Sequence, residues 1–462
     1  MQFKKTINTQ FKKQVTHLGF TIVELLIVIV VIGILATLAI VAYNRTIQNS
    51  HVASLQSDLG TAAGQLNLDN GSNGTYPASA ALANNGAGLK PSAGTTFTYV
   101  YTSSDNSYCL IGTKNGASYY VAEGTDNPVA GTACPPRVTT LAGSGAAGFA
   151  DGTGSIAQLS GPTSVAVNSS GTIYVADSSN NRIRKITSGG VVTTLAGSGV
   201  AGSTDGVGSA AQFSHPVGLA VDASDTVFVA DPGNNRIRKI TSGGVVTTLA
   251  GSTYGFADGA GSAAQFRNPR GVALDSSGTA YVTDSDNNCI RKISPAGVVT
   301  TLAGSSVTYG FADGTGSAAQ FAFPWGVAVD SSGTIYVADY DYSLIRKITS
   351  AGVVTTLAGS TLGGYGVYGF ADGTGGDAQF YYPTGMAIDS SGSIYVADRA
   401  NGRIRKITSA GVVTTVAGNG GNGFADGAVN TAQFAAPYGV AVDSSGTIYV
   451  GDTFNNRIRK VR

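Results

Sequence analysis

Aspartates at one repeated position are the first candidates for chemistry in this chain. Each follows an apolar run such as Ile-Tyr-Val-Ala and precedes an Arg-Lys pair: Asp177, Asp231, Asp284, Asp339, Asp398 and Asp452. A group present in every copy of a repeat favours a structural role, either as a turn cap or as the ion-pair partner of the Arg-Lys pair. Calcium binding through the six carboxylates is the weaker hypothesis.

Histidine and cysteine are too few here to suggest catalysis. His215 is the single histidine of the repeated region, and one imidazole cannot supply a metal site built from several histidines; we interpret it as a surface loop residue. Cys289 stands where other copies have the first Arg of Arg-Ile-Arg-Lys, which indicates drift of the repeat rather than a nucleophile. We therefore predict no catalytic residue, no metal and no cofactor, and an enzyme is the weaker hypothesis.

Large aromatic side chains gather where the repeats differ from one another. They lie around the proline that opens each repeat, or in the turn after the repeated Asp: Phe323, Trp325, Tyr340, Tyr342, Tyr381, Tyr382, Tyr438 and Phe454. Such rings offer rigid amphipathic contact area for a sugar face or a peptide. The alternative is that the rings only pack the bases of the loops. We predict a ligand-binding face made of these eight residues.

The repeats themselves indicate how these residues are positioned. Six prolines open them at intervals of 53 to 59 residues: Pro162, Pro216, Pro269, Pro324, Pro383 and Pro437. Each unit contains four short β-rich runs, the first two joined by a tight Asp-Ser-Ser-Gly hairpin. Four-stranded units in series predict a β-propeller. The last unit lacks its fourth strand, and an orphan strand at 138–143 completes it, which closes the ring and removes two exposed edges.

The sequence words of these units resemble a known repeat. Gly-Val-Ala-Val-Asp, Ile-Tyr-Val-Ala-Asp and Asn-Asn-Arg-Ile-Arg-Lys are similar to NHL repeats. The resemblance implies a six-bladed NHL-type β-propeller over residues 137–462. It implies less about function, because the family includes lyases, lactonase-like enzymes, and protein- and RNA-binding modules. Its lyases use several histidines around a central metal, and this propeller has one.

The N-terminus carries a second, unrelated pattern. Four lysines precede Gly19-Phe20, and an apolar run of 24 residues, 20–43, contains one early carboxylate, Glu24. The run is long enough to cross a bilayer, with the lysines on the cytoplasmic side. A carboxylate in lipid is costly and needs a reason. One interpretation is a plain signal anchor in which the glutamate has no role.

Gly19, Phe20 and Glu24 at this spacing resemble the N-terminus of type IV prepilins. The resemblance implies a leader at 1–19, cleavage between Gly19 and Phe20 by a membrane prepilin peptidase, and methylation of the new amine. It also implies that Glu24 pairs with the terminal amine of a neighbouring subunit, two opposite charges that would fix register in an apolar bundle.

A small head is expected after the apolar run. Leu55, Leu59, Ala62, Ala63 and Leu66 recur on one helical face, which predicts one helix over 20–66 whose second half covers a sheet. Strands are expected at 96–101, 108–111 and 118–122, within a globular head of 67–136. The pilin resemblance also implies a disulfide between Cys109 and Cys134, worth about 3 kcal/mol for a loop of this length; two free thiols are the alternative.

Charge excludes one class of partner. The 462-residue chain has a formal net charge of +1, and removal of the leader with its four lysines leaves −3. A strongly electropositive nucleic-acid binder is not indicated, and no nucleic-acid partner is predicted.

Together these patterns predict a mainly β protein: a long N-terminal helix, a small β head and a propeller. We expect a pilin-like surface filament subunit, favouring a minor one, that displays the propeller for adhesion to an extracellular carbohydrate or protein. It would lie in the cytoplasmic membrane through 20–43 before assembly, then outside the cell, with other pilin subunits and the prepilin peptidase as partners. The alternatives are a structural filament coat, a surface-tethered lyase or lactonase-like enzyme, and a pseudopilin of a type II secretion system.

Overall fold

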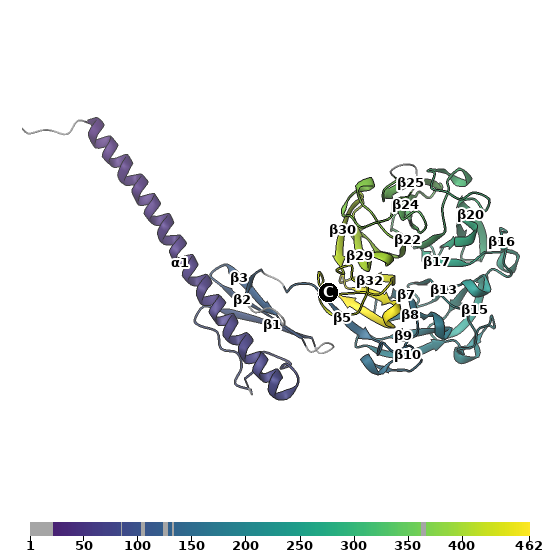
Figure 1. Cartoon of the computed structure of the whole chain (residues 1–462), viewed down its shortest axis with the longest axis horizontal. Helices are drawn as coiled ribbons and strands as arrows, with labels where there is room; N and C mark the ends of the chain where they lie inside the picture. The colour runs from purple at the N-terminus through teal and green to yellow at the C-terminus, as the bar shows by residue number, and fades with distance from the viewer. Residues whose placement is uncertain (1–21, 85, 103–106, 123–127, 132–133, 362–365) are drawn as a thin grey trace, which may run out of the picture. The chain divides into compact units, whose positions relative to one another are not determined.

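The computed structural model describes residues 22–462 apart from 85, 103–106, 123–127, 132–133 and 362–365 (Figure 1). The chain divides into two compact units, Met1–Cys134 and Pro135–Arg462. The predicted leader and the cleavage site at Gly19 and Phe20 lie outside the described residues. Glu24 lies on the described helix, but its side chain is outside the description.

One helix, α1 (Ile22–Asn73), dominates the first unit. It is long and apolar enough to cross a membrane, and its apolar stretch is 0% buried within the protein. An N-terminal apolar helix of this kind acts as a membrane anchor or a signal sequence. The second half of α1 is different, because Leu55, Leu59 and Leu66 are completely buried.

The helix continues past Leu66, where the sequence predicted its end. Asn67 and Asn70 have weak helix propensity, yet the helix runs on to Asn73. Tertiary hydrogen bonds hold these last turns: Tyr76 donates from its hydroxyl to Asn67 Oδ1 at 3.1 Å. The backbone N–H of Asn84 donates to Asp69 Oδ2 at 2.6 Å. Packing therefore overrides the weak local propensity of the Asn residues.

A four-stranded antiparallel sheet packs against the second half of α1. Its strands follow chain order: β1 (Thr96–Thr102), β2 (Ser107–Lys114), β3 (Ala117–Ala122) and β4 (Val129–Ala130). Three of these were expected; β4 has two residues, too few to give a period-two pattern. The predicted helix face, Leu55 to Leu66, packs with Tyr108, Leu110 and Val121 in one core.

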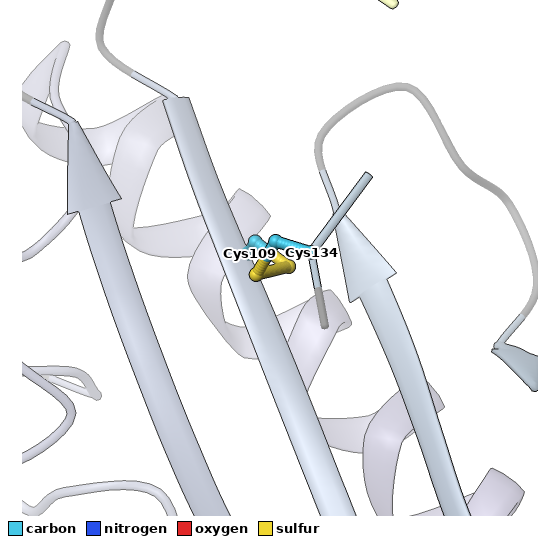
Figure 2. Close-up of a disulfide and its surroundings, with 2 residues drawn as sticks. All are labelled: Cys109 and Cys134. Carbon is cyan, nitrogen blue, oxygen red and sulfur yellow. A yellow bond between two sulfur atoms is a disulfide. The ribbon is translucent and has the colours of Figure 1, made fainter. Parts of the chain in front are cut away.

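A disulfide closes this unit. Figure 2 shows the bond between Cys109 of β2 and Cys134, whose Cα atoms are 6.0 Å apart and 25 positions apart in sequence. The separation matches the geometry of an ordinary disulfide. The third cysteine, Cys289, is free and buried in the other unit.

Six antiparallel sheets form the second unit, arranged as the blades of a propeller (Figure 1). In each blade an inner, a second, a third and a fourth strand lie side by side. A two-residue strand pairs with the fourth strand at the outer edge. Blade 1 contains β7 (Pro162–Val167), β8 (Ile173–Asp177), β9 (Arg182–Ile186), β10 (Val191–Ala196) and β6 (Gly152–Thr153). Blade 2 contains β12 (Leu219–Val221), β13 (Val227–Asp231), β14 (Arg236–Ile240), β15 (Val245–Ala250) and β11 (Gly206–Val207). Blade 3 contains β17 (Pro269–Leu274), β18 (Ala280–Asp284), β19 (Cys289–Ile293), β20 (Val298–Gly304) and β16 (Gly259–Ala260).

The remaining blades repeat this order. Blade 4 contains β22 (Pro324–Val329), β23 (Ile335–Asp339), β24 (Leu344–Ile348), β25 (Val353–Ala358) and β21 (Gly314–Thr315). Blade 5 contains β27 (Pro383–Ile388), β28 (Ile394–Asp398), β29 (Arg403–Ile407), β30 (Val412–Ala417) and β26 (Gly373–Thr374). Blade 6 contains β32 (Pro437–Val442), β33 (Ile448–Asp452), β34 (Arg457–Val461), β5 (Arg137–Ala142) and β31 (Gly427–Ala428).

The blades have five strands instead of the predicted four. The additional strand begins at the glycine of the Asp-Gly pair in each Gly-Phe-Ala-Asp-Gly-like loop and pairs with the start of the fourth strand, as Gly314 does with Val354. Two residues are too short to show β periodicity in the sequence, so this strand was not predicted.

Closure of the ring follows the prediction. Strand β5, from the N-terminal end of this unit, pairs with β34 from Ala142↔Ile458 to Val138↔Val461. The C-terminus consequently lies beside β5 (Figure 1). Apolar side chains fill the spaces between neighbouring blades; one cluster joins Leu141 of β5 to Val175 of blade 1 and Ile458 of blade 6. No blade can bury its two faces alone, so the closed ring is the folding unit.

Candidate functional site

A buried arginine lies between two aspartates in every blade. We call this arrangement the clamp; its arginines are Arg184, Arg238, Arg291, Arg346, Arg405 and Arg459, all 0% exposed. In blade 4, Arg346 Nη1 lies 2.9 Å from Asp339 Oδ2 and Nη2 lies 2.8 Å from Asp313 Oδ1. Asp339 is fully buried, whereas the Asp313 side chain is 49% exposed.

The clamps confirm the ion-pair interpretation of the six repeated aspartates. The second partner of each arginine was not predicted; these partners are Asp151, Asp205, Asp258, Asp313, Asp372 and Asp426. Burial raises the pKa of Asp339 to about 7 and that of Asp284 to about 6, and hydrogen bonds from the paired arginines oppose the rise. Buried ion pairs of this kind need complete hydrogen bonding to be tolerated.

The buried aspartate of each clamp also fixes the chain that approaches the next proline. Asp284 Oδ1 accepts a hydrogen bond from the backbone N–H of Arg267 at 2.7 Å. The equivalent bonds run from Ser160, Ser214, Ala322, Tyr381 and Ala435. The repeated polar core thus positions the non-repeated residues that follow it.

Those non-repeated residues form three rings around the channel mouth, with one member from each blade. The first mouth ring precedes the opening proline: Gly161, His215, Asn268, Phe323, Tyr382 and Ala436. The second mouth ring follows that proline: Thr163, Val217, Arg270, Trp325, Thr384 and Tyr438. The third mouth ring follows the buried aspartate: Ser178, Pro232, Ser285, Tyr340, Arg399 and Thr453.

Close approach of the inner strands holds the second mouth ring around a narrow neck. A Cβ at Gly271 would collide with the carbonyl of Trp325, and one at Gly326 would collide with the carbonyl of Thr384. Glycine at the next position therefore lets neighbouring inner strands touch. The space left at the neck is about 50 Å³.

Above the neck, unequal side chains leave a hollow of about 510 Å³. Small residues from blades 1, 2 and 6 line it, among them Ser160, Ser179 and Val217. Arg270, Trp325 and Tyr438 of the second mouth ring also line it. The hollow exists because the side chains of the second mouth ring differ in size from blade to blade.

Six of the eight predicted aromatic residues form one continuous cluster beside this hollow. Ring centroids lie 5.1 Å apart for Trp325 and Tyr340, 5.4 Å for Trp325 and Tyr438, and 4.5 Å for Tyr340 and Tyr382. Phe323 packs on Trp325, and Tyr381 packs on Tyr382. These rings are half-buried, so most of their surface packs against other residues, as the alternative interpretation expected. Within the cluster, Trp325 and Tyr438 line the hollow.

The other two predicted residues lie apart from the cluster. Phe454 is 62% exposed and lines the hollow from blade 6. Tyr342 packs instead on Tyr309 and Phe311, with ring centroids 5.7 and 4.8 Å away, and it is not among the residues that line the hollow.

Two arginines that sequence reasoning did not select contact the cluster. The Arg270 guanidinium lies 3.9 Å from the centre of the Trp325 ring. Arg399 lies 4.6 Å from that of Tyr438 and donates to the Tyr340 hydroxyl at 2.6 Å. Their signal was available: each occupies a mouth-ring position where no other blade has a cation. His215, expected on the surface, is exposed and also lines the hollow.

The first mouth ring carries backbone strain. All six of its residues have φ between +49° and +58°, although Phe323, Tyr382 and Ala436 are not residue types that favour this region. Phe323 at +55° and Tyr382 at +53° accept a conformation that costs about 1–2 kcal/mol for an ordinary side chain. Strained side chains cluster where a protein retains them for a role other than folding.

Groups for covalent or metal chemistry do not converge here. Among the described residues there is no cluster of three His, Cys, Asp or Glu side chains that could hold a metal. Cys289 is completely buried, and burial raises the pKa of its thiol. The described residues of the mouth present aromatic rings, cations and hydroxyls.

The repeated segments match a known family. The NHL repeat matches residues 159–186, 213–240, 266–293, 321–348, 380–407 and 434–461, the first three strands of every blade. Over 284 residues the chain is 29% identical to Protein SUPPRESSOR OF QUENCHING 1, chloroplastic, of Arabidopsis thaliana, covering 58% of this chain and 27% of that relative. Over 321 residues it is 26% identical to NHL repeat-containing protein 2 of Homo sapiens, covering 62% and 44%. The chain therefore spans less than half the length of these relatives.

Solved structures share the propeller fold. An auxiliary nutrient binding protein from Bacteroides thetaiotaomicron superposes with a TM-score of 0.55 at 17% identity, covering 81% of this chain and 98% of that one. A protein of unknown function from the same organism gives a TM-score of 0.54 at 20% identity, covering 80% and 98%. At these identities the likeness shows the fold alone.

Proposed function

We propose that this chain is a type IV pilin-like subunit of a surface filament, favouring a minor subunit. It carries six NHL repeats that form a propeller behind an N-terminal apolar helix. The propeller is displayed outside the cell, where its mouth binds a ligand in adhesion. The observation that carries the proposal is the division of α1 into an apolar half without protein cover and a half packed on a small sheet.

The two halves of α1 suit different surroundings. In the first half, Ile32, Leu38 and Ile40 are each 60% exposed, which a membrane or a bundle of identical helices would cover. In the second half, Leu55 and Leu59 are buried on the four-stranded sheet that the Cys109–Cys134 bond closes. A helix that is membrane-inserted at one end and domain-forming at the other supports a subunit that assembles from the membrane.

Glu24 gives the assembly hypothesis its testable residue. A single carboxylate within an apolar run is stabilised when it meets an opposite charge in the same apolar surroundings. The proposed partner is the amine created at Phe20 of a neighbouring subunit after cleavage behind Gly19. This pairing would set the stagger between adjacent helices.

Binding at the mouth is the second part of the proposal. Its support is the contrast between the repeated clamps and the strained, aromatic-rich mouth rings, whose hollow is of the size that small ligands occupy. Many copies along a filament, or one copy at its tip, would multiply weak contacts with a surface.

A filament assay tests the assembly part. In a host with an active prepilin peptidase, Glu24→Ala and the uncharged Glu24→Gln should both reduce the yield of sheared filaments that contain the protein. Gln48→Ala, at an exposed position of the same helix, should leave the yield unchanged. Equal yields for all variants, or a mature protein that retains its leader, would contradict the pilin assignment.

Imaging the same filaments with an antibody to the propeller separates the remaining roles. Label at the tip supports a minor adhesive subunit, and label along the whole length supports a structural coat. Filaments that appear only when a secretion system is overexpressed would indicate a pseudopilin. Turnover of a lyase or lactonase substrate that chelation abolishes would indicate a tethered enzyme instead.

A further inference from the structure

We infer that the hollow at the channel mouth binds an acidic saccharide, with a sugar carboxylate on Arg270 and the sugar ring against Trp325 and Tyr438. This inference rests on the proposed ligand-binding function of the propeller and names the ligand class. It does not depend on how, or whether, the chain assembles into filaments.

The charge of the hollow is the first argument. Among the described residues, its lining contains the guanidinium of Arg270 and no carboxylate. Elsewhere in the propeller the strand arginines of the clamps each meet two aspartates, as Arg291 meets Asp284 at 2.6 Å and Asp258 at 2.7 Å. The hollow therefore carries a local positive charge, whereas the buried arginines of the clamps are neutralised by their aspartates.

Arg270 is the second argument, because its hydrogen-bonding capacity is unused. In the described part of the chain its guanidinium has no ion pair, and its buried Nε has no hydrogen-bond partner. Partial burial lowers the pKa of this arginine, and Asp286 opposes that effect without lining the hollow. A carboxylate would satisfy the planar donor pair and restore the lost solvation.

Packing keeps this guanidinium in place for a ligand. It lies 3.9 Å from the centre of the Trp325 ring and 4.9 Å from that of Phe323. These cation–π contacts fix its position before a ligand arrives, which reduces the conformational entropy lost on binding.

The remaining walls suit a sugar better than a peptide side chain. Trp325 and Tyr438 present ring surface on one side, with Phe454 exposed nearby. Elsewhere in the lining, the hydroxyls of Ser160 and Ser179 have no side-chain hydrogen bond in the described structure. A pyranose has an apolar ring face for the aromatic wall and several hydroxyls for the serines. At about 510 Å³ the hollow accepts a short oligosaccharide.

Isothermal titration of the full-length protein in detergent micelles tests the inference. The probes are a galacturonic acid trisaccharide, sialyllactose, a neutral galactose trisaccharide, lactose and an oligoglutamate peptide. We expect at least one acidic saccharide to bind about tenfold or more tightly than its neutral counterpart, and its affinity to fall as NaCl is raised. Whichever acid binds distinguishes a polysaccharide uronate from a terminal sialic acid.

Matched arginine variants identify the residue responsible. Arg270→Gln should weaken the acidic probe by about 10- to 100-fold and remove its advantage over the neutral probe. Arg267→Gln is the control, because this arginine lies in the same blade, stacks on Tyr254 at 4.7 Å and does not line the hollow. Arg270→Lys keeps the charge and loses the planar fork, so it should be intermediate, and it serves if the Gln variant unfolds.

The outcomes separate this inference from the proposed function. Equal affinity for acidic and neutral sugars, or full acidic binding by Arg270→Gln, overturns the acidic class, and the proposed function stands if Trp325→Ala still abolishes that binding. Tighter binding of oligoglutamate than of any sugar overturns the saccharide in favour of a peptide. Absence of binding to every probe overturns the inference, while the filament assay judges the assembly part independently.

Discussion

The clamps and the mouth rings occupy the same six blades but differ in what they repeat. Every clamp has an Asp, an Arg and a second Asp at equivalent positions, with the arginine completely buried. The second mouth ring changes from Thr163 to Arg270 to Trp325 between equivalent positions. Repetition within one chain thus separates side chains that a blade needs in order to fold from side chains that one particular face uses.

The two regions also differ in conformational cost. The clamp arginines satisfy most of their donors, and the buried aspartates accept further bonds, such as that from Asn287 to Asp284 at 2.9 Å. In the first mouth ring, by contrast, Phe323 and Tyr382 hold a left-handed backbone. The comparison teaches that the repeated polar core stabilises the ring and that the mouth retains its side chains at some cost in stability.

The largest expected effect comes from breaking one clamp. Asp284→Ala leaves Arg291 without its buried partner and removes the anchor of the Arg267 backbone, so we expect a loss of about 3–5 kcal/mol in the free energy of unfolding. Denaturant unfolding followed by tryptophan fluorescence and circular dichroism measures it. Asp258→Ala, which removes the half-exposed partner of the same arginine, should cost about 1–2 kcal/mol. Equal losses in the free energy of unfolding would show that the buried and the half-exposed aspartate stabilise the clamp equally.

Acid should act on another repeated feature, the hairpin between the first and second strands. Burial alone would raise the pKa of Asp330, but hydrogen bonds from Ser332 and Thr334 outweigh it and lower that pKa. The same lowering applies to Asp222, Asp275, Asp389 and Asp443. A lowered folded pKa stabilises the protein above the unfolded value of about 3.9, and this contribution is lost as pH falls through the folded pKa.

Replacing those five aspartates by Asn should therefore flatten the fall in Tm between pH 5 and pH 2, measured by scanning calorimetry. Blade 1 already has Asn168 at this position, where its Oδ1 accepts from Thr172 N at 2.8 Å, so Asn suits the hairpin. Asp377→Asn, at an exposed carboxylate, is the control. An unchanged acid limb in the fivefold variant would show that these carboxylates do not set the acid stability.

The smallest effect concerns strain in the first mouth ring. Ala436 has φ +49° and no long side chain to use there, so Ala436→Gly should raise the free energy of unfolding by about 1 kcal/mol. Gly161→Ala, at the equivalent position of blade 1 with φ +58°, should lower it by a similar amount. Denaturant midpoints measure both. If Ala436→Gly destabilises the protein, the left-handed backbone of the first mouth ring does not cost stability.

Local patterns predicted the architecture because they carry the information that builds it. The proline spacing gave six blades, the orphan run at 138–143 gave the closure, and the helical face from Leu55 to Leu66 gave the core of the first unit. The end of α1 at Asn73 and the strand β4 escaped prediction, since tertiary hydrogen bonds and a two-residue pairing decide them.

The candidate site was predictable only in part. Aromatic side chains at unequal positions pointed to the correct face, and Trp325, Tyr438 and Phe454 line its hollow. Arg270 was missed because only aromatic residue types were selected at the unequal positions, and its place in one hollow with Ser160 and Ser179 depends on contacts among several blades. Tyr342 was placed on the same face by its turn, yet it turns toward Tyr309.

Paired measurement of binding and stability tests the separation of clamp from mouth most directly. Trp325→Thr gives blade 4 the residue type of Thr163 and Thr384; it should weaken acidic-trisaccharide binding by roughly 30-fold or more and cost only about 1–2 kcal/mol of stability. Asp258→Ala should cost a similar amount of stability and leave binding unchanged. Equal weakening of binding by both variants, or full binding by Trp325→Thr, would contradict the account.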